Sequence, residues 1–121
     1  MIENRTFDEI EVGDSASLSR VLGEQEIQLF ALASGDVNPA HLDKEYAATD
    51  MFHQVIAHGL WGGGLISAVL GTELPGPGAI YLSQSLKFER PVVLGDTITA
   101  TVTVTEKQPE HHVVILRSEE H

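Results

Sequence analysis

The clearest alternation of apolar and polar residues lies in the carboxyl-terminal part of the chain. In "DTITATVTVTEK", apolar residues occupy every second position and threonines occupy most of the positions between them. This period is typical of a β-strand with one buried face, here formed by Ile98, Ala100, Val102 and Val104. "HHVVILRSE" predicts another strand, which starts at its two histidines. "AIYLSQSLKFERPV" also alternates until Pro91 interrupts it, so we expect these three strands to form an antiparallel meander.

The amino-terminal half combines strand and helix patterns. "FDEIEVGDSASLSRVL" has a turn at Gly13 and then alternates as an edge strand does. "GEQEIQLFALASG" spaces its apolar residues close to the helical period, and Gly35 stands where that helix should end. "DKEYAAT" predicts a short helix with Asp43 as its N-cap. The residues from Gln54 to Ala57 are expected to form a loop.

The longest apolar run, "HGLWGGGLISAVLGTEL", extends from His58 to Leu74. It is apolar on all sides, which predicts a helix that is buried all round. Each glycine of its triplet, residues 62–64, disfavours a helix by about 0.8–1 kcal/mol relative to alanine. We favour the explanation that a sheet or ligand approaches the helix backbone closely there, and the alternative is that the run is not helical at its start. Helices that precede an antiparallel sheet predict an α+β fold, with the sheet wrapped around this helix.

Composition and charge limit the classes of partner. The chain has 121 residues, of which 42% are hydrophobic, so we expect a single domain over residues 1–121. Seven Lys and Arg against eighteen Asp and Glu give a net charge of −11. A chain this acidic repels the phosphates of DNA and RNA, so we expect no nucleic-acid partner. Lys87 and Arg90 come nearest to a local anion site.

Several features indicate the cellular compartment. The chain has no cysteine, which excludes disulfides and thiolate metal sites. Its first residues, "MIENRTFDEI", lack the basic and apolar segments of a signal peptide. The apolar run is too short to span a bilayer. We therefore expect a cytoplasmic protein without a membrane partner.

"SGDVNPAHLD" is the segment with the most evident chemistry. It places a carboxylate, Asp36, five residues before an imidazole, His41. Pro39 fixes its own φ and keeps Asn38 extended, which predicts a stiff loop between two helices. A stiff loop that carries both groups suits general acid–base catalysis. The alternative is structural, with Asp36 and Asn38 forming turn hydrogen bonds and His41 capping a helix.

A second candidate lies at the start of the long helix. A helix N-terminus presents unpaired N–H groups, and Gly59 would let an oxygen approach its own N–H as in an oxyanion hole. Ser67 lies eight residues later and can face the same side. Alternatively, Gly59 only relieves crowding at the helix start, and Ser67 is a small interface serine hydrogen-bonded to its own helix. His41, His53 and His58 lack the spacing of metal ligands on a helix, so we predict no metal site.

Three segments together resemble one family: "FALASGDVNPAHLDKEYA", "IAHGLWGGGLISAVLG" and "LPGPGAIYLSQSLKFERPVVLGDTITATVTV". They are similar to the MaoC-like dehydratases, specifically the (R)-specific enoyl-CoA hydratases, and the G-D-x-N-P-x-H core is the most specific part. The resemblance implies a hot-dog fold, in which an antiparallel sheet wraps a long helix. It also implies a homodimer or higher homo-oligomer, with an acyl-CoA substrate bound near the subunit interface.

The resemblance implies a reaction that needs neither cofactor nor metal. Water adds reversibly to a trans-2-enoyl-CoA and gives (R)-3-hydroxyacyl-CoA. By matched position, Asp36 and His41 resemble the pair that activates water and delivers a proton to C2. The backbone N–H of Gly59 resembles the oxyanion donor. Ser67 resembles a group that supports the Asp36 carboxylate, and Asn38 resembles a structural member of the loop.

Other functions stay open beside this one. A hot-dog acyl-CoA thioesterase would share the oxyanion site, and a non-catalytic acyl-binding or dimerisation domain of a larger enzyme would share the fold. The family implies one more strand after "RSEEH", so we expect a domain without its last strand or a piece of a longer fusion protein. Lys87 and Arg90 are candidates for binding the CoA phosphates, and otherwise they are ordinary solvent-facing charges. The sequence does not set the acyl-chain length.

Overall fold

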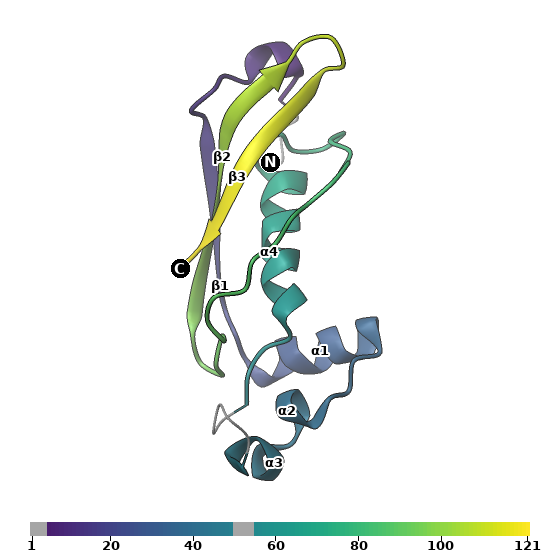
Figure 1. The fold of residues 1–121 in the computed structure, drawn as a ribbon, viewed down its shortest axis with the longest axis vertical. Coiled ribbons are helices and arrows are strands. Elements are labelled where there is room, and N and C mark those ends of the chain that lie inside the picture. The colour runs from purple at the N-terminus through teal and green to yellow at the C-terminus, as the bar shows by residue number, and fades with distance from the viewer. Residues whose placement is uncertain (1–4, 50–54) are drawn as a thin grey trace. The chain divides into compact units, whose positions relative to one another are not determined.

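The computed structural model describes residues 5–49 and 55–121. The chain divides into two compact units, of which unit 1 contains residues 1–19, 64–85 and 99–121 and unit 2 contains residues 20–63 and 86–98. The elements in chain order are η1 (Phe7–Glu9), β1 (Ser15–Val21), α1 (Glu24–Ser34), α2 (Pro39–Leu42), α3 (Lys44–Thr49), α4 (Gly59–Thr72), β2 (Thr97–Gln108) and β3 (Val113–Glu120) (Figure 1). Helices combined with an antiparallel sheet make the fold α+β, as expected.

A three-stranded sheet in the order β1-β2-β3 supplies the strands of unit 1. β2 and β3 are antiparallel, with Ala100 opposite Glu120 and one bulge further along the pair. On the β1 side, the hydroxyls of Ser17 and Thr101 lie 2.8 Å apart and form a cross-strand hydrogen bond. Ser19 and Thr99 form a second such bond at 2.7 Å, so two of the threonines that alternate with the apolar residues of β2 bond to β1.

The alternation of β2 is confirmed by its burial. Its four predicted inward residues are at most 9% exposed, and these are Ile98, Ala100, Val102 and Val104. β3 is also present, but it begins at Val113 and not at the two histidines. His111 and His112 lie in the turn between β2 and β3, where His112 has a left-handed φ of 51°. A turn of this kind interrupts the strand before the valines resume it.

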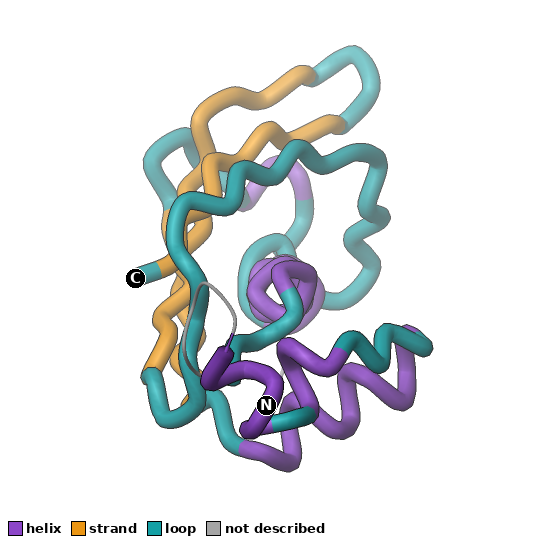
Figure 2. The backbone as a smooth tube through the Cα atoms, turned by 60° about the horizontal axis from the view of Figure 1, so that its bottom comes forward, coloured by secondary structure: helices purple, strands orange, loops and turns teal. Residues whose placement is uncertain are grey.

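The strand predicted over "AIYLSQSLKFERPV" is wrong. Residues 79–89 contain no strand, and Figure 2 shows this length of chain as loop. Ile80, Leu82 and Phe88 are 81%, 72% and 62% exposed. Alternation makes a segment able to pair, but a strand forms only where a neighbouring strand satisfies its N–H and C=O groups. Within the described residues β1, and not this segment, is the third strand of the sheet, so the expected meander is also wrong.

The long apolar helix is present as α4, although it is not buried on every side. Val69 is fully buried, and Leu65 and Ile66 are at most 6% exposed. A stripe along α4 is nevertheless exposed, and it consists of Leu60, Gly64, Ser67 and Gly71. These residues follow the helical spacing of one face. No helix among the described residues is long and apolar enough to cross a membrane.

The glycines of α4 differ in their surroundings. A Cβ added to Gly63 would meet the Leu86 side chain at 3.4 Å, an ordinary van der Waals distance. A Cβ added to Gly64 would have no described atom within 4 Å. The expected close approach to the helix backbone is therefore wrong for Gly64, because its exposed position faces open space.

Gly64→Ala is expected to stabilise the fold by about 0.5–1 kcal/mol, since alanine loses less backbone entropy on forming a helix. The matched control is Gly13→Ala, which also meets no described atom within 4 Å but has a φ of 97°. Alanine at that φ should destabilise by about 1–2 kcal/mol. Thermal unfolding of both variants shows whether each substitution raises or lowers the melting temperature. A lower melting temperature for Gly64→Ala would show that this position is crowded in the folded protein.

Candidate active site

The loop after α1 is positioned by the end of that helix. Gly35 adopts a left-handed φ of 79° and its N–H donates to the Ala31 carbonyl, which ends α1 as predicted. The Ser34 hydroxyl donates to the Phe30 carbonyl at 2.7 Å and accepts the Asp36 N–H at 3.1 Å. Asp36 is therefore held directly against the last turn of a regular helix.

Asp36 and His41 are joined by a short, hydrogen-bonded path. The Asp36 carboxylate accepts the Asn38 N–H at 3.2 Å, and the Asn38 carbonyl accepts the His41 N–H at 3.0 Å. Pro39 does not keep this segment in a loop, because it starts the one-turn helix α2, which contains His41. The expectation that His41 lies in a loop is thus wrong. Proline favours the first position of a helix, since its fixed φ suits that position and its missing N–H would have no helical partner.

The proton on the His41 ring can be assigned from its partner. Nδ1 of His41 lies 2.8 Å from the Ile56 carbonyl oxygen. A carbonyl only accepts hydrogen bonds, so Nδ1 carries a proton. In the neutral ring, Nε2 is then the unprotonated nitrogen and is able to accept a proton.

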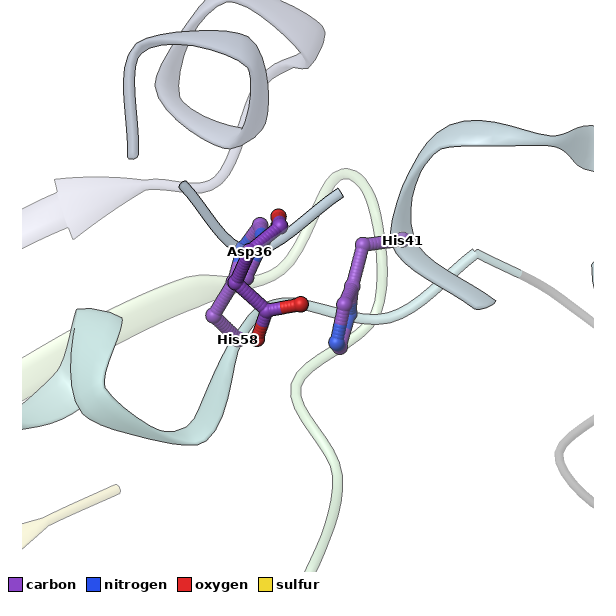
Figure 3. A group of neighbouring side chains, drawn as sticks. All are labelled: Asp36, His41 and His58. Carbon is purple, nitrogen blue, oxygen red and sulfur yellow. The ribbon is translucent and has the colours of Figure 1, made fainter. Parts of the chain in front are cut away.

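His58 completes a cluster with these two residues (Figure 3). Its side chain is 3% exposed, and Nε2 donates to the backbone carbonyl of Asp36 at 2.8 Å. Its ring stacks on the ring of His41, with centroids 4.0 Å apart and an angle of 24° between the planes. The ring of Phe30 also contacts the His58 ring, with the two centroids 4.8 Å apart. Segments far apart in the sequence therefore meet at one pair of imidazoles.

The cluster has the residue types of a metal site, with ligand atoms of Asp36, His41 and His58 within 4.8 Å of one another. An imidazole binds a metal through a lone pair in the plane of its ring. The stacked planes of His41 and His58 are nearly parallel and 4.0 Å apart, so the two rings do not aim lone pairs at one ion. The arrangement suits proton transfer better than metal binding. His53, the third histidine weighed as a metal ligand in the sequence, lies outside the described residues.

Gly59 begins α4 and is exposed. A Cβ at this position would lie 3.2 Å from a ring carbon of Phe88, which is tighter than an ordinary contact. Glycine therefore does allow a close approach to the start of α4, and here the approaching group is an aromatic ring. Ser67 lies on the exposed stripe of the same helix.

A small cavity of about 100 Å³ adjoins His41 on the side of α1 and α3. Lys44 of α3 and Glu24 of α1 line it and form an ion pair at 2.7 Å. The hydrogen bond from Lys44 and its charge hold the pKa of Glu24 below the usual range. Asp43 caps α3 as predicted, accepting the N–H of Glu45 at 2.9 Å. These contacts link α1 to α3 and cap α3 next to His41.

One known family matches the chain over nearly its whole length. A model of the MaoC like domain matches residues 6–119. The chain belongs to the MaoC-like domain family. The resemblance in "SGDVNPAHLD" and the segments after it is thereby confirmed.

Individual relatives of this MaoC-like domain are named as hydratases or dehydratases. An (R)-specific enoyl-CoA hydratase of Rhodospirillum rubrum is 56% identical over 112 residues, which cover 93% of this chain and 78% of that protein. A 3-hydroxybutyryl-CoA dehydratase of Methylorubrum extorquens is 48% identical over 86% of this chain and 66% of that protein. The solved (R)-hydratase of A. caviae, described as involved in PHA biosynthesis, superposes with a TM-score of 0.89 at 44% identity, over 92% of this chain and 84% of that one. The expected hot-dog fold is confirmed by this likeness.

His58 is the residue that the sequence reasoning did not assign to the site. The sequence analysis considers it only as the residue before Gly59 and as one of three histidines rejected as metal ligands. Its contact with Asp36 joins residues 22 positions apart, and no local pattern signals such a contact. Lys87 and Arg90 are not brought together by an interaction with each other in the described chain. Lys87 instead forms an exposed ion pair with Glu89 at 3.5 Å.

Proposed function

We propose that this MaoC-like domain is an (R)-specific enoyl-CoA hydratase. The observation that carries the proposal is the Asp36–His41 pair, in which the partner of Nδ1 leaves Nε2 of His41 as the proton acceptor. A relative named for this activity and 56% identical supports it. The substrate is a trans-2-enoyl-CoA and the product is (R)-3-hydroxyacyl-CoA.

The chemistry needs one proton removed and one proton delivered. Asp36 and His41 hold a water molecule, whose oxygen adds to C3 of the substrate as its proton moves to the pair. The pair then delivers a proton to C2, so the water is added without any other reactant. General acid–base groups of this kind work through hydrogen-bond distance and fixed orientation. The helix end, the Asn38 contact and the Ile56 carbonyl supply that orientation.

Negative charge develops on the thioester oxygen while water attacks C3. We assign the backbone N–H of Gly59, at the start of α4, to this oxygen, because a helix N-terminus stabilises negative charge. The ring of Phe88, which lies beside Gly59 and is 62% exposed, has to leave room for the substrate. Ser67 supports the Asp36 carboxylate and Asn38 stabilises the loop. The polarised thioester makes a metal or organic cofactor unnecessary.

The test of this function is the wild-type protein with crotonyl-CoA. Hydration removes the absorbance of the conjugated enoyl group and leaves the thioester intact. A thiol-reactive dye reports CoA release, which is the expected signal if the protein is a thioesterase instead. Loss of absorbance without released thiol supports the hydratase. Binding of the acyl-CoA without either change would identify a non-catalytic acyl-binding domain.

Lys87 and Arg90 are proposed to bind the CoA phosphates, because an acidic protein needs local cations to hold them. The double substitution Lys87→Gln/Arg90→Gln is expected to raise KM with kcat nearly unchanged, since the phosphates are remote from C2 and C3. Arg117→Gln is the control, because Arg117 is also an exposed cation and pairs with Glu119. An equal KM for all three proteins would show that Lys87 and Arg90 are ordinary surface charges.

We also propose that residues 1–121 form one MaoC-like domain that assembles as a homodimer or higher homo-oligomer in the cytoplasm. Exposed apolar side chains support assembly, since monomeric proteins seldom expose large contiguous apolar patches. In unit 2, Leu32 is 82% exposed and Val37, next to Asp36, is 66% exposed. A second subunit would cover such side chains and enclose the site.

A further inference from the structure

His58 has features that stability alone does not explain. Among the described residues, His58 is the one polar residue that is buried, with an exposed fraction of 3%. Its Nδ1 has no hydrogen-bond partner among those residues. A buried acceptor without a partner weakens the folded state. An apolar side chain of similar size would fill the same space without that penalty. An unpaired buried group in a folded protein calls for a functional reason.

We propose that His58 is a positioning residue that sets the geometry between Asp36 and His41. One ring touches both members of the pair, but by different means. Its Nε2–H holds the backbone carbonyl of Asp36 at 2.8 Å, and its face stacks on the His41 ring at 4.0 Å. This inference rests on the proposed function, because the two groups that it aligns are the proposed acid–base pair.

The two contacts restrict different motions. The bond from His41 Nδ1 to the Ile56 carbonyl fixes that ring within its own plane. The stack on His58 prevents the same ring from tilting out of plane. The bond from His58 to the Asp36 carbonyl fixes the backbone from which the carboxylate extends. Among the described residues, the other side-chain hydrogen bonds at Asp36 are those with its neighbours in sequence, Ser34 and Asn38.

Two variants separate the hydrogen bond from the ring. His58→Gln places an amide N–H near the position of Nε2 and removes the ring, whereas His58→Phe keeps a stacking ring and removes the donor. His58→Phe is expected to lower kcat on crotonyl-CoA by about 10–100-fold, the usual effect of a small misalignment. KM should change by less than about twofold, because substrate binding does not depend on this alignment. His58→Gln should recover at least about tenfold of the lost kcat, because the donor to Asp36 is the contact that aligns the carboxylate.

His112→Phe is the matched control. His112 also stacks on an aromatic ring, that of Phe7 at 5.0 Å, but it lies in unit 1 outside the proposed site. This control should keep the wild-type kcat. Melting temperatures of all variants show whether a loss of rate follows a loss of stability. Equal kcat for His58→Phe and wild type, or equal losses in His58→Phe and His58→Gln that follow their melting temperatures, would overturn the positioning role.

A measurement independent of turnover separates this inference from the proposed function. If the wild type does not hydrate any enoyl-CoA, the function fails, but the backbone amide NMR signals of Asp36, Val37 and Asn38 still report the loop. We expect them to shift in His58→Phe and to return toward the wild-type positions in His58→Gln. Unchanged signals in His58→Phe would overturn the inference whatever the activity.

Discussion

Asp36→Asn and His41→Gln are each expected to lower the hydration of crotonyl-CoA by about 10²–10⁴-fold, the usual contribution of a general acid–base group. The amide that replaces the Asp36 carboxylate would keep an oxygen able to accept the Asn38 N–H, but it would lose the negative charge. The amide that replaces the His41 ring cannot take up a proton from water at neutral pH. Loss of the enoyl absorbance gives kcat and KM, and thermal unfolding checks that both variants fold.

The control for the carboxylate is Asp43→Asn. Asp43 is also an exposed carboxylate next to a short helix, where it accepts backbone N–H groups as the cap of α3. Asparagine caps helices about as well as aspartate, so this variant should keep both stability and rate. Wild-type rates for both Asp36→Asn and His41→Gln would contradict the proposed chemistry.

The double variant Asp36→Asn/His41→Gln distinguishes a pair from two independent groups. If the two side chains act on the same water, the second substitution should lower the rate far less in the double variant than it does in the otherwise wild-type protein. The reason is that the effects of residues that act as a unit are not additive. The two free-energy changes would add if each residue made a separate contribution. The expected result is therefore a double variant little slower than the slower single variant.

The parts of the fold that the sequence predicted well are those set by local patterns. The period of two in β2, the glycine that ends α1 and the aspartate that caps α3 all depend on residues a few positions apart. Each is present in the structure, with Gly35 at a φ of 79° and Asp43 bonded to the N–H of Glu45. Local backbone sterics and short-range hydrogen bonds decide these features.

The parts that the sequence predicted poorly depend on distant partners. Residues 79–89 have a strand-like pattern, but a strand needs a neighbour that no local pattern supplies. The sequence also did not predict the exposed face of α4, because an apolar helix is buried only where distant elements cover it. His58 is the clearest case at the site, since its role is visible only once the chain has folded back on Asp36.

The candidate site combines both kinds of information. The five-residue separation of Asp36 and His41 predicted that they belong together, and the structure places them in one cluster with His58. The sequence did not predict that Pro39 would begin a helical turn, which places His41 on α2 and lets Nδ1 reach the carbonyl of Ile56. That contact assigns the ring proton, so the proposed base depends on a segment 15 residues away.

Leu22→Ala is expected to be the most destabilising single change considered for this protein. Leu22 is fully buried in unit 2, and its backbone bonds with Asp96 and Gly95 at 2.8 Å fix the chain just before α1. Truncating a buried leucine costs about 2–5 kcal/mol, through lost transfer energy and the cavity left behind. A domain of this size is stable by only about 5–15 kcal/mol, so this loss is a large fraction of the total.

The matched control is Leu32→Ala, which makes the same chemical change on α1 at a side chain that is 82% exposed. Chemical denaturation should show a change of less than about 0.5 kcal/mol for this variant in the monomer. Because α1 carries the loop with Asp36, Leu22→Ala should also lose activity at a lower temperature than wild type, while its kcat in the cold stays close to normal. Similar unfolding midpoints for the two leucine variants would mean that Leu22 is not part of the core. A loss in Leu32→Ala that grows as the protein is diluted would instead place Leu32 at a subunit interface, as the proposed assembly requires.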